Sequence, residues 1–524
     1  GEGSWVKTAD GVIITPYVGP AKKVRLEVMS NDIVRVTATP TDSLDLPKSL
    51  MVVAAPSGAH FTVSESGGML ALKTAHVTAQ VVLRTGAVSF LNAQGKEVLA
   101  EQGPRKLAPE TVQGHNFYAI HQDFNRGSDE AFYGLGQHQY QPLNYNGQDV
   151  DLAQHNMDIA MPFLVSSRNY GVLWDNNGIT RFGDPKPYQG LSESKSLTVT
   201  DADGKPGGLT ATYAIDGAVK VKRIETEPNY EFIRDLARWP SSLMDAKTGA
   251  EVPGQTVTWE GGIESDKTGV HRFRLYVSSY VKLYVDGKLM VDAWRQNWNP
   301  WYRDFDVAMK AGERHTLRIE WIPSDGYIRL LHADPLPEDQ RHDLSLSSDV
   351  ANAIDYYFVN GKNLDGVISG YRQLTGKAVM LPRWAFGFWQ SRDRYQTQDE
   401  LLGVVKAYRQ QDVPLDVIVQ DWRYWADPTW GSHIFDKTRY PDPAGMIRTV
   451  HAENAHIMIS VWPKFYPSTQ NYKELDAAGA IYRHNVELGV KDWGCCLSTY
   501  YDPYSKAGQD SYWRQIQEKL GVLG

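Results

Sequence analysis

Residues 414–422, with the sequence PLDVIVQDW, form a short apolar run that ends in a carboxylate and an indole. The part from Pro414 to Val419 predicts a buried strand. A helix is expected before it, from the capping box that begins at Thr397 to about Gln411, and another follows from Pro443 to Asn454. Alternation of strand and helix indicates parallel strands joined by right-handed crossovers.

The same alternation continues on both sides of this stretch. Strands are expected at 385–388 and 456–461, and a further helix at 471–480. An open doubly wound sheet and an eight-fold barrel both fit this pattern. No glycine-rich phosphate turn follows the first strand, which favours the barrel.

The barrel expected from residue 378 is incomplete within this chain. A whole (β/α)8 barrel needs about 250 residues, more than the stretch 378–524 provides. Residues 520–524 resemble the start of another strand. Because an open barrel would expose sheet edges and core, we expect the sequence to be the N-terminal part of a longer polypeptide.

Upstream of residue 378 the pattern is that of β-sandwiches. Short alternating runs with glycine-rich turns predict an N-terminal sandwich over 1–225, to which residues 341–377 return. Between them, residues 226–340 are expected to form an inserted β-sandwich. Its strongest signal is a hairpin whose two-residue turn is Asp286-Gly287.

Aromatic and charged residues follow each predicted barrel strand. Parallel α/β folds form their sites at the carboxyl ends of the strands, so these residues are expected to meet at one rim. A carboxylate there can accept hydrogen bonds from two sugar hydroxyls, and indoles can line a sugar ring. The candidate substrate-binding residues are Asp421, Trp422, Trp462, Trp389, Arg392 and Trp493. Pairing of Asp421 with Arg392 or Arg423 is the structural alternative.

A second aromatic group lies in the predicted insertion. Its loop at 294–303 carries Trp294, Trp298 and Trp301, and loops on rigid scaffolds commonly carry binding residues. These indoles could hold distal sugars of a branched oligosaccharide. Packing of a long loop is the alternative.

Composition excludes several classes of protein. A formal net charge of −8 argues against a nucleic-acid binder, and no apolar run is long enough to span a membrane. The two cysteines, Cys495 and Cys496, are adjacent, and neighbours rarely bridge, so neither a disulfide framework nor a cysteine zinc site is expected. The compartment stays open, with a bacterial periplasm or cell surface favoured.

Several motifs resemble glycoside hydrolase family 31, in both the sandwich and the barrel. The insertion resembles the protective-antigen-type β-sandwich of some α-xylosidases that act on xyloglucan fragments. The motifs are Phe386–Arg392, Val419–Trp422, Ser460–Trp462, Tyr133–Gln137, Pro162–Ser167 and Leu173–Asn176.

The resemblance implies a retaining exo-α-glycosidase that uses two aspartates and needs no metal or organic cofactor. It aligns Asp421 with the carboxylate that holds hydroxyls in subsite −1, and Trp462 with the indole of that pocket. Both catalytic aspartates would follow Gly524, so the segment alone is expected to be inactive. The expected activity is release of α-linked xylose from the non-reducing end of xyloglucan oligosaccharides, with an oligosaccharide as the partner. An α-glucosidase or transglucosidase, and a non-catalytic carbohydrate-binding protein, are the alternatives.

Overall fold

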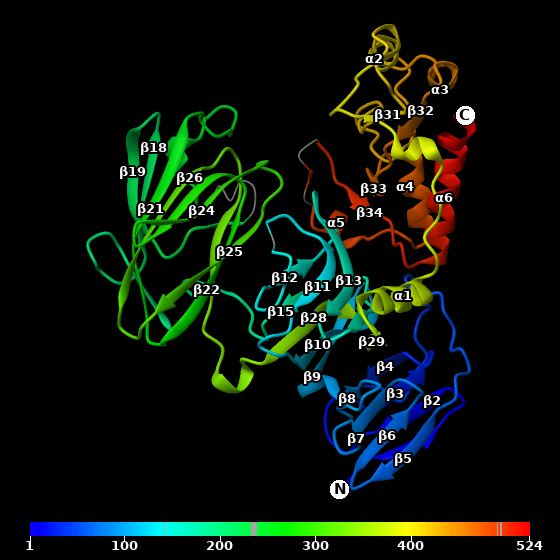
Figure 1. Ribbon diagram of the computed structural model, residues 1–524. Coiled ribbons are helices and arrows are strands. Elements are labelled where there is room, and N and C mark those ends of the chain that lie inside the picture. The colour runs from blue at the N-terminus through cyan, green and yellow to red at the C-terminus, as the bar shows by residue number, and fades with distance from the viewer. Residues whose placement is uncertain (141, 232–237, 490, 493–494) are drawn as a thin grey trace. The chain divides into compact units, whose positions relative to one another are not determined.

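A computed structural model describes residues 1–140, 142–231, 238–489, 491–492 and 495–524. Two compact units divide the chain (Figure 1). The first contains residues 1–110 and 117–376, and the second contains residues 111–116 and 377–524. Among the described helices, none is both long enough and apolar enough to cross a membrane.

The N-terminal sandwich consists of two antiparallel sheets. The eight-stranded sheet has the order β1(Ser4–Lys7), β2(Gly11–Thr15), β3(Lys23–Val28), β4(Ile33–Thr39), β29(Ile354–Asn360), β14(Tyr170–Trp174), β13(Ile159–Ser166) and β11(Phe132–Gln137). The nine-stranded sheet has the order β12(Val150–Leu152), β15(Thr180–Gly183), β28(Asp343–Ala351), β10(His115–Asn125), β9(Glu97–Val112), β8(Val88–Leu91), β7(Thr78–Val82), β6(Met69–Lys73) and β5(Thr62–Ser66).

Period-two alternation explains why these strands pack as two layers. Along β3, Val24, Leu26 and Val28 are buried and the residues between them are not, as expected when successive side chains point to opposite faces. They share a core with Leu70 and Leu72 of the other sheet. Strands β28 and β29 confirm that the chain returns to the sandwich after the insertion, and α1(Leu364–Thr375) follows them.

The insertion is a second β-sandwich with its own core. One sheet has the order β16(Gln189–Gly190), β27(Ile328–Ala333), β22(Gly269–Val277) and β25(Trp301–Met309), with β20(Asn229–Tyr230) beside β27. The other has the order β19(Ala218–Glu225), β18(Leu209–Ile215), β21(Gln255–Ser265), β26(Arg314–Ile322), β23(Ser279–Val285) and β24(Lys288–Arg295), with β17(Leu197–Thr200) beside β21. Short 3-10 turns lie at Ser241–Leu243 and Glu338–Gln340.

The insertion contains the predicted hairpin, but it begins earlier in the sequence than predicted. The hairpin of β23 and β24 turns at Asp286-Gly287, where both residues have positive φ, as a type I′ turn requires. Residues 189–225, expected in the N-terminal sandwich, pair instead with strands of the insertion. Strand pairing thus places the start of this module near residue 189 rather than 226.

The second unit contains the start of the barrel. Three short strands, β30(Trp389–Gln390), β31(Val417–Gln420) and β32(His456–Ile459), are parallel neighbours. The helices are α2(Gln398–Gln410), α3(Pro443–Ala452), α4(Gln470–Ala477), α5(His484–Glu487) and α6(Lys506–Lys519), and β33(Lys464–Phe465) pairs with β34(Thr499–Tyr500). Leu401 and Val405 of α2 pack in one core with Ile418. The described residues of this unit form no closed barrel.

Three local expectations were wrong. Residues 383–386 form a 3-10 turn, so the first strand begins at Trp389 and not at Ala385. The chain end also forms a 3-10 turn, at Gly521–Leu523, instead of starting a strand. Cys495 and Cys496 are joined in a disulfide. This bond links adjacent residues, so it closes no long loop and constrains the fold only locally.

Candidate functional site

The candidate site lies where β31 and β32 end. Gln420 of β31 is opposite Ile459 of β32, and the Ser460 backbone N–H donates to the Gln420 carbonyl at 2.9 Å. Asp421 and Trp462 therefore follow adjacent parallel strands at the same edge of the sheet. This juxtaposition is the one expected from the strand pattern.

Asp421 is half-buried and keeps its side chain close to its own backbone. Its Oδ1 accepts the backbone N–H of Trp422 at 2.8 Å. The two arginines considered as partners pair elsewhere: Arg392 lies 3.3 Å from Glu400, and Arg423 lies 3.0 Å from Asp427. Within the described ranges no cation forms an ion pair with Asp421, which leaves its carboxylate able to accept hydroxyl groups.

Indoles gather at the same edge of the sheet. The rings of Trp422 and Trp462 stack with centroids 6.0 Å apart, and Trp430 lies 5.0 Å from Trp462. Trp462 is 41% exposed, whereas Trp430 and Trp425 are buried. Trp430 and Trp425 thus pack in the core of this unit, whereas Trp462 presents an accessible face.

Trp389 and Arg392 do not join this group. Trp389 pairs in register with Val417 at the start of β31, and its indole N–H donates to the Ala385 carbonyl at 3.1 Å. Its ring lies beside that of Trp384, with centroids 6.3 Å apart. The late start of the first strand explains this, because Trp389 lies inside the strand and not beyond its carboxyl end. Trp493 lies outside the described residues.

Sequence reasoning did not assign roles to the groups that hold the indoles in place. The Trp422 indole N–H donates to Asp393 at 2.8 Å. Lys464 lies 4.0 Å from the centre of the Trp430 ring and pairs with Asp492 at 2.8 Å. In the sequence, only the position of these residues near the ends of the predicted strands indicated a role in the site.

Asp492 also orders Tyr466. The Tyr466 hydroxyl donates to Asp492 at 3.0 Å. Burial, together with the Asp492 carboxylate, raises the pKa of Tyr466. The phenol therefore stays protonated at neutral pH and acts as a hydrogen-bond donor.

The tryptophans of the insertion fall into two environments. Trp294 and Trp298 are 55% and 57% exposed. Trp301 stacks on His155 of the N-terminal sandwich, with ring centroids 4.2 Å apart. Trp294 and Trp301 line one pocket, together with Tyr302, whereas Trp298 lies outside its lining.

A cluster of metal-ligating residue types lies inside the insertion. Ligand atoms of His271, His332 and Asp334 lie within 4.8 Å of one another. The two imidazoles hydrogen-bond to each other at 2.8 Å, and Lys267 pairs with Asp334 at 3.0 Å. Burial lowers the pKa of His332 to about 4, which keeps it neutral. These contacts already use the groups, so the cluster forms an internal polar network.

Three family models match this chain. The glycosyl hydrolases family 31 TIM-barrel domain covers residues 378–524, and the glycosyl hydrolase 31 N-terminal galactose mutarotase-like domain covers residues 23–182. The chain belongs to glycosyl hydrolase family 31. The PA14 domain, over residues 245–333, confirms the protective-antigen-type insertion of this family 31 chain.

Solved and curated relatives of this family 31 chain include α-xylosidases. The structure of a family 31 α-xylosidase from Xanthomonas citri matches 99% of this chain at 50% identity with a TM-score of 0.90, and 56% of that protein is covered. An α-xylosidase of Saccharolobus solfataricus is 38% identical over 187 residues, which are 35% of this chain and 26% of that protein. An α-xylosidase from a soil metagenome, solved with xylose, shares the fold at 21% identity and a TM-score of 0.60, with 99% of this chain and 56% of that one covered. The chain thus spans about half of these structures.

Proposed function

We propose that the polypeptide carrying this chain is a retaining exo-α-glycosidase that releases α-linked xylose from the non-reducing end of xyloglucan oligosaccharides. The observation that carries the proposal is the 50% identity to a family 31 α-xylosidase over 99% of this chain. The position of Asp421 and Trp462 at one sheet edge supports it. Because curated relatives of this chain include proteins named α-glucosidase and isomaltosyltransferase, α-glucosidase or transglucosidase activity is the second candidate.

In the proposed reaction this chain binds and orients the terminal sugar. The carboxylate of Asp421 accepts hydrogen bonds from two hydroxyls, and the Trp462 indole covers the apolar face of the ring. Such bonds accelerate the reaction to the extent that they strengthen in the oxocarbenium-like transition state.

The two catalytic aspartates belong, in this proposal, to barrel strands that follow residue 524. One carboxylate attacks the anomeric carbon while the other gives its proton to the departing glycosidic oxygen. A water molecule then cleaves the glycosyl–enzyme bond and returns that proton. Retaining enzymes hold the two groups about 5–5.5 Å apart.

Xylose and glucose differ by one hydroxymethyl group, so the selectivity of the enzyme depends on whether the site accepts that group. Asp421 is followed by Trp422 and Arg423, whose bulk at the rim would crowd that group. A pocket that discriminates by one such group favours one sugar over the other by only about 1–3 kcal/mol. Rates on p-nitrophenyl α-xyloside and α-glucoside, measured side by side, decide between the two candidates, and a faster glucoside would overturn the xylosidase proposal.

Asp421→Asn, made in a polypeptide with the complete barrel, is expected to lower kcat/KM on the aryl xyloside at least about a hundredfold. Loss of hydrogen bonds to a charged group, at about 1.5–3 kcal/mol each, gives that magnitude. Asp510→Asn, which removes an exposed carboxylate on α6, is the control and should leave the rate unchanged. Wild-type kinetics for Asp421→Asn would remove Asp421 from the site.

Trp298→Ala tests the distal-sugar role of the insertion. We expect KM for a xyloglucan oligosaccharide to rise several-fold, since one aromatic contact is worth about 0.5–1.5 kcal/mol beyond its area. The aryl xyloside reaches no distal surface and should be unaffected. Trp513→Ala, at an exposed indole of α6, is the matched control. Equal losses on both substrates would argue against distal binding.

A further inference from the structure

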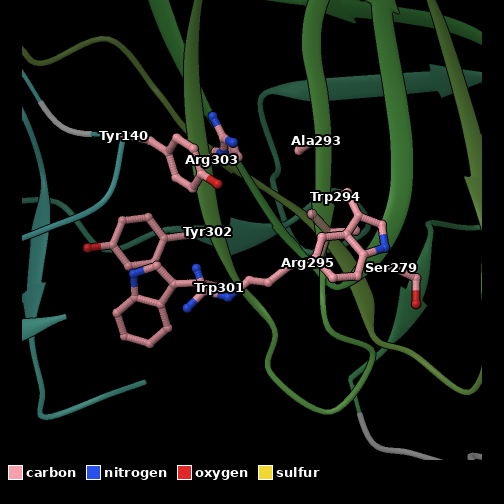
Figure 2. A pocket seen from close by; sticks show the side chains of 9 residues that line it. Tyr140, Ser279, Ala293, Trp294, Arg295, Trp301, Tyr302 and Arg303 are labelled. Atoms are coloured by element: carbon pink, nitrogen blue, oxygen red, sulfur yellow. The ribbon is translucent and has the colours of Figure 1, made fainter. Parts of the chain in front are cut away.

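A pocket in the insertion combines aromatic rings with two guanidinium groups (Figure 2). Its space is about 270 Å³, counting the solvent at its mouth. Because that space includes open solvent, the pocket can seat one face of a ligand but does not enclose one. The residues that matter for its chemistry are Tyr140, Trp294, Arg295, Trp301, Tyr302 and Arg303.

Neither arginine forms an ion pair with an acid of the described residues. Arg295 is only 7% exposed, its Nε is buried without a hydrogen-bond partner, and one Nη donates to the Asn156 carbonyl at 2.9 Å. Arg303 lies 3.1 Å from the centre of the Tyr140 ring. Throughout the described part of the chain, no carboxylate oxygen lies within 4.0 Å of either guanidinium. The charge of Asp158 acts on Arg295 without forming an ion pair with it.

Two nearby arginines show that the lack of a partner is specific to the pocket. Arg272 pairs with Asp306 and Arg274 pairs with Asp304, each at 2.9 Å. Within the described ranges Arg303 has no such ion pair, and burial lowers its pKa. Arginine nevertheless stays protonated in proteins, so the pocket holds two positive charges that form no ion pair with a carboxylate of the described residues.

A buried acceptor whose charge acts on Arg295 also lacks a partner. It is Oδ2 of Asp158, which is buried without a hydrogen bond, as is the donor Nε of Arg295. Native proteins leave few such groups, and each one calls for a water, an ion or a ligand. Donors and acceptors mixed in this way match hydroxyl groups, which can both donate and accept.

We propose that this pocket binds a uronic acid unit of an oligosaccharide, with its carboxylate between Arg295 and Arg303 and its ring against the indoles. The guanidinium fork matches the geometry of a carboxylate. Indole faces match the apolar side of the sugar ring. The inference rests on the distal-sugar part of the proposed function and names a ligand class for it.

Binding measured on the 524-residue chain tests this without hydrolysis, so a failure leaves the glycosidase proposal standing. The calorimetric probes are methyl α-glucuronide, methyl α-xyloside and sodium acetate. We expect the glucuronide to bind at least about tenfold more tightly than the other two, because a charged hydrogen bond contributes about 1.5–3 kcal/mol. Its affinity should fall as salt is raised.

Arg303→Gln and Arg295→Gln should each weaken glucuronide binding at least tenfold. Lys288→Gln, which removes an exposed cation elsewhere on the insertion, is the control. Arg303 is half-buried, so Arg303→Gln keeps the test valid if the buried Arg295 cannot be changed without unfolding. Equal binding of the xyloside, or no binding at all, would overturn the proposal. Acetate binding as tightly as the glucuronide would make this a carboxylate site without sugar selectivity.

Discussion

At the scale of the residue, His433 shows how burial fixes a protonation state. It is 3% exposed, and its ring lies 6.1 Å from that of Phe465 and 6.0 Å from that of Tyr512. Burial lowers its pKa to about 4, below the ordinary value of about 6.5. The folded chain therefore holds a neutral imidazole at a pH where the unfolded chain already binds a proton.

This difference predicts a loss of stability in acid. Above pH 6.5 both states hold His433 neutral and the free energy of unfolding does not depend on its titration. As pH falls from 6.5 toward 4, only the unfolded chain binds the proton, so the free energy of unfolding drops by up to about 3 kcal/mol. His433→Asn removes the titrating group, and asparagine tolerates the positive φ of this position. Urea unfolding at pH 7 and pH 4.5 should show a smaller pH effect for the variant. Parallel pH profiles for the two proteins would contradict the assignment.

Individual site residues were predictable to different degrees. Asp421 and Trp462 could be placed together because the carboxyl ends of parallel strands meet at one edge. The partners of Arg392 and Arg423 could not, because an arginine side chain reaches several acids and the sequence does not rank them. Trp389 was placed at the rim because its strand was expected four residues too early.

At the scale of the element, α2 is specified by its own first turn. The Thr397 hydroxyl accepts the Glu400 backbone N–H at 3.1 Å, and the Glu400 carboxylate accepts the Gln396 N–H at 2.7 Å. Side chains thereby satisfy N–H groups that the helix cannot. Local signals of this kind made the helix predictable, whereas the first strand, with only two paired residues, depends on its neighbours.

Thr397→Ala is expected to lower the free energy of unfolding by about 1 kcal/mol, because it removes this cap. Thr397→Ser keeps an oxygen in the same position and is the matched control. Urea denaturation followed by tryptophan fluorescence measures both. If serine and alanine destabilise the chain equally, the hydroxyl does not cap the helix.

At the scale of the whole molecule, Arg274 ties the insertion to the N-terminal sandwich. Its guanidinium lies between the rings of Tyr188 and Tyr302, 4.4 and 3.8 Å from their centres. It pairs with Asp304 of β25 at 2.9 Å and with Asp151 of β12 at 3.2 Å. Sequence periodicity locates both sandwiches, yet it carries no information on contacts between residues more than a hundred positions apart.

Arg274→Met should destabilise the first unit by about 3–5 kcal/mol, since it leaves the buried Asp304 without its cation. Adding Asp304→Asn should recover part of this loss. Thermal unfolding of the two single variants and the double variant gives the coupling energy. Arg318→Met, at an exposed ion pair, should cost at most about 1 kcal/mol. Additive losses at 274 and 304 would show that the pair is not coupled.

The point at which the insertion leaves the sandwich has an evolutionary consequence. Strand β15 ends at Gly183, which lies opposite Ser345 of the adjacent strand β28. The departing and returning chain ends are therefore neighbours in one sheet, as far apart as the two sides of a hairpin. A tight turn could replace the whole module without changing the order of the strands. This junction allows the insertion to be gained, exchanged or lost in evolution while the strand order of the N-terminal sandwich is kept.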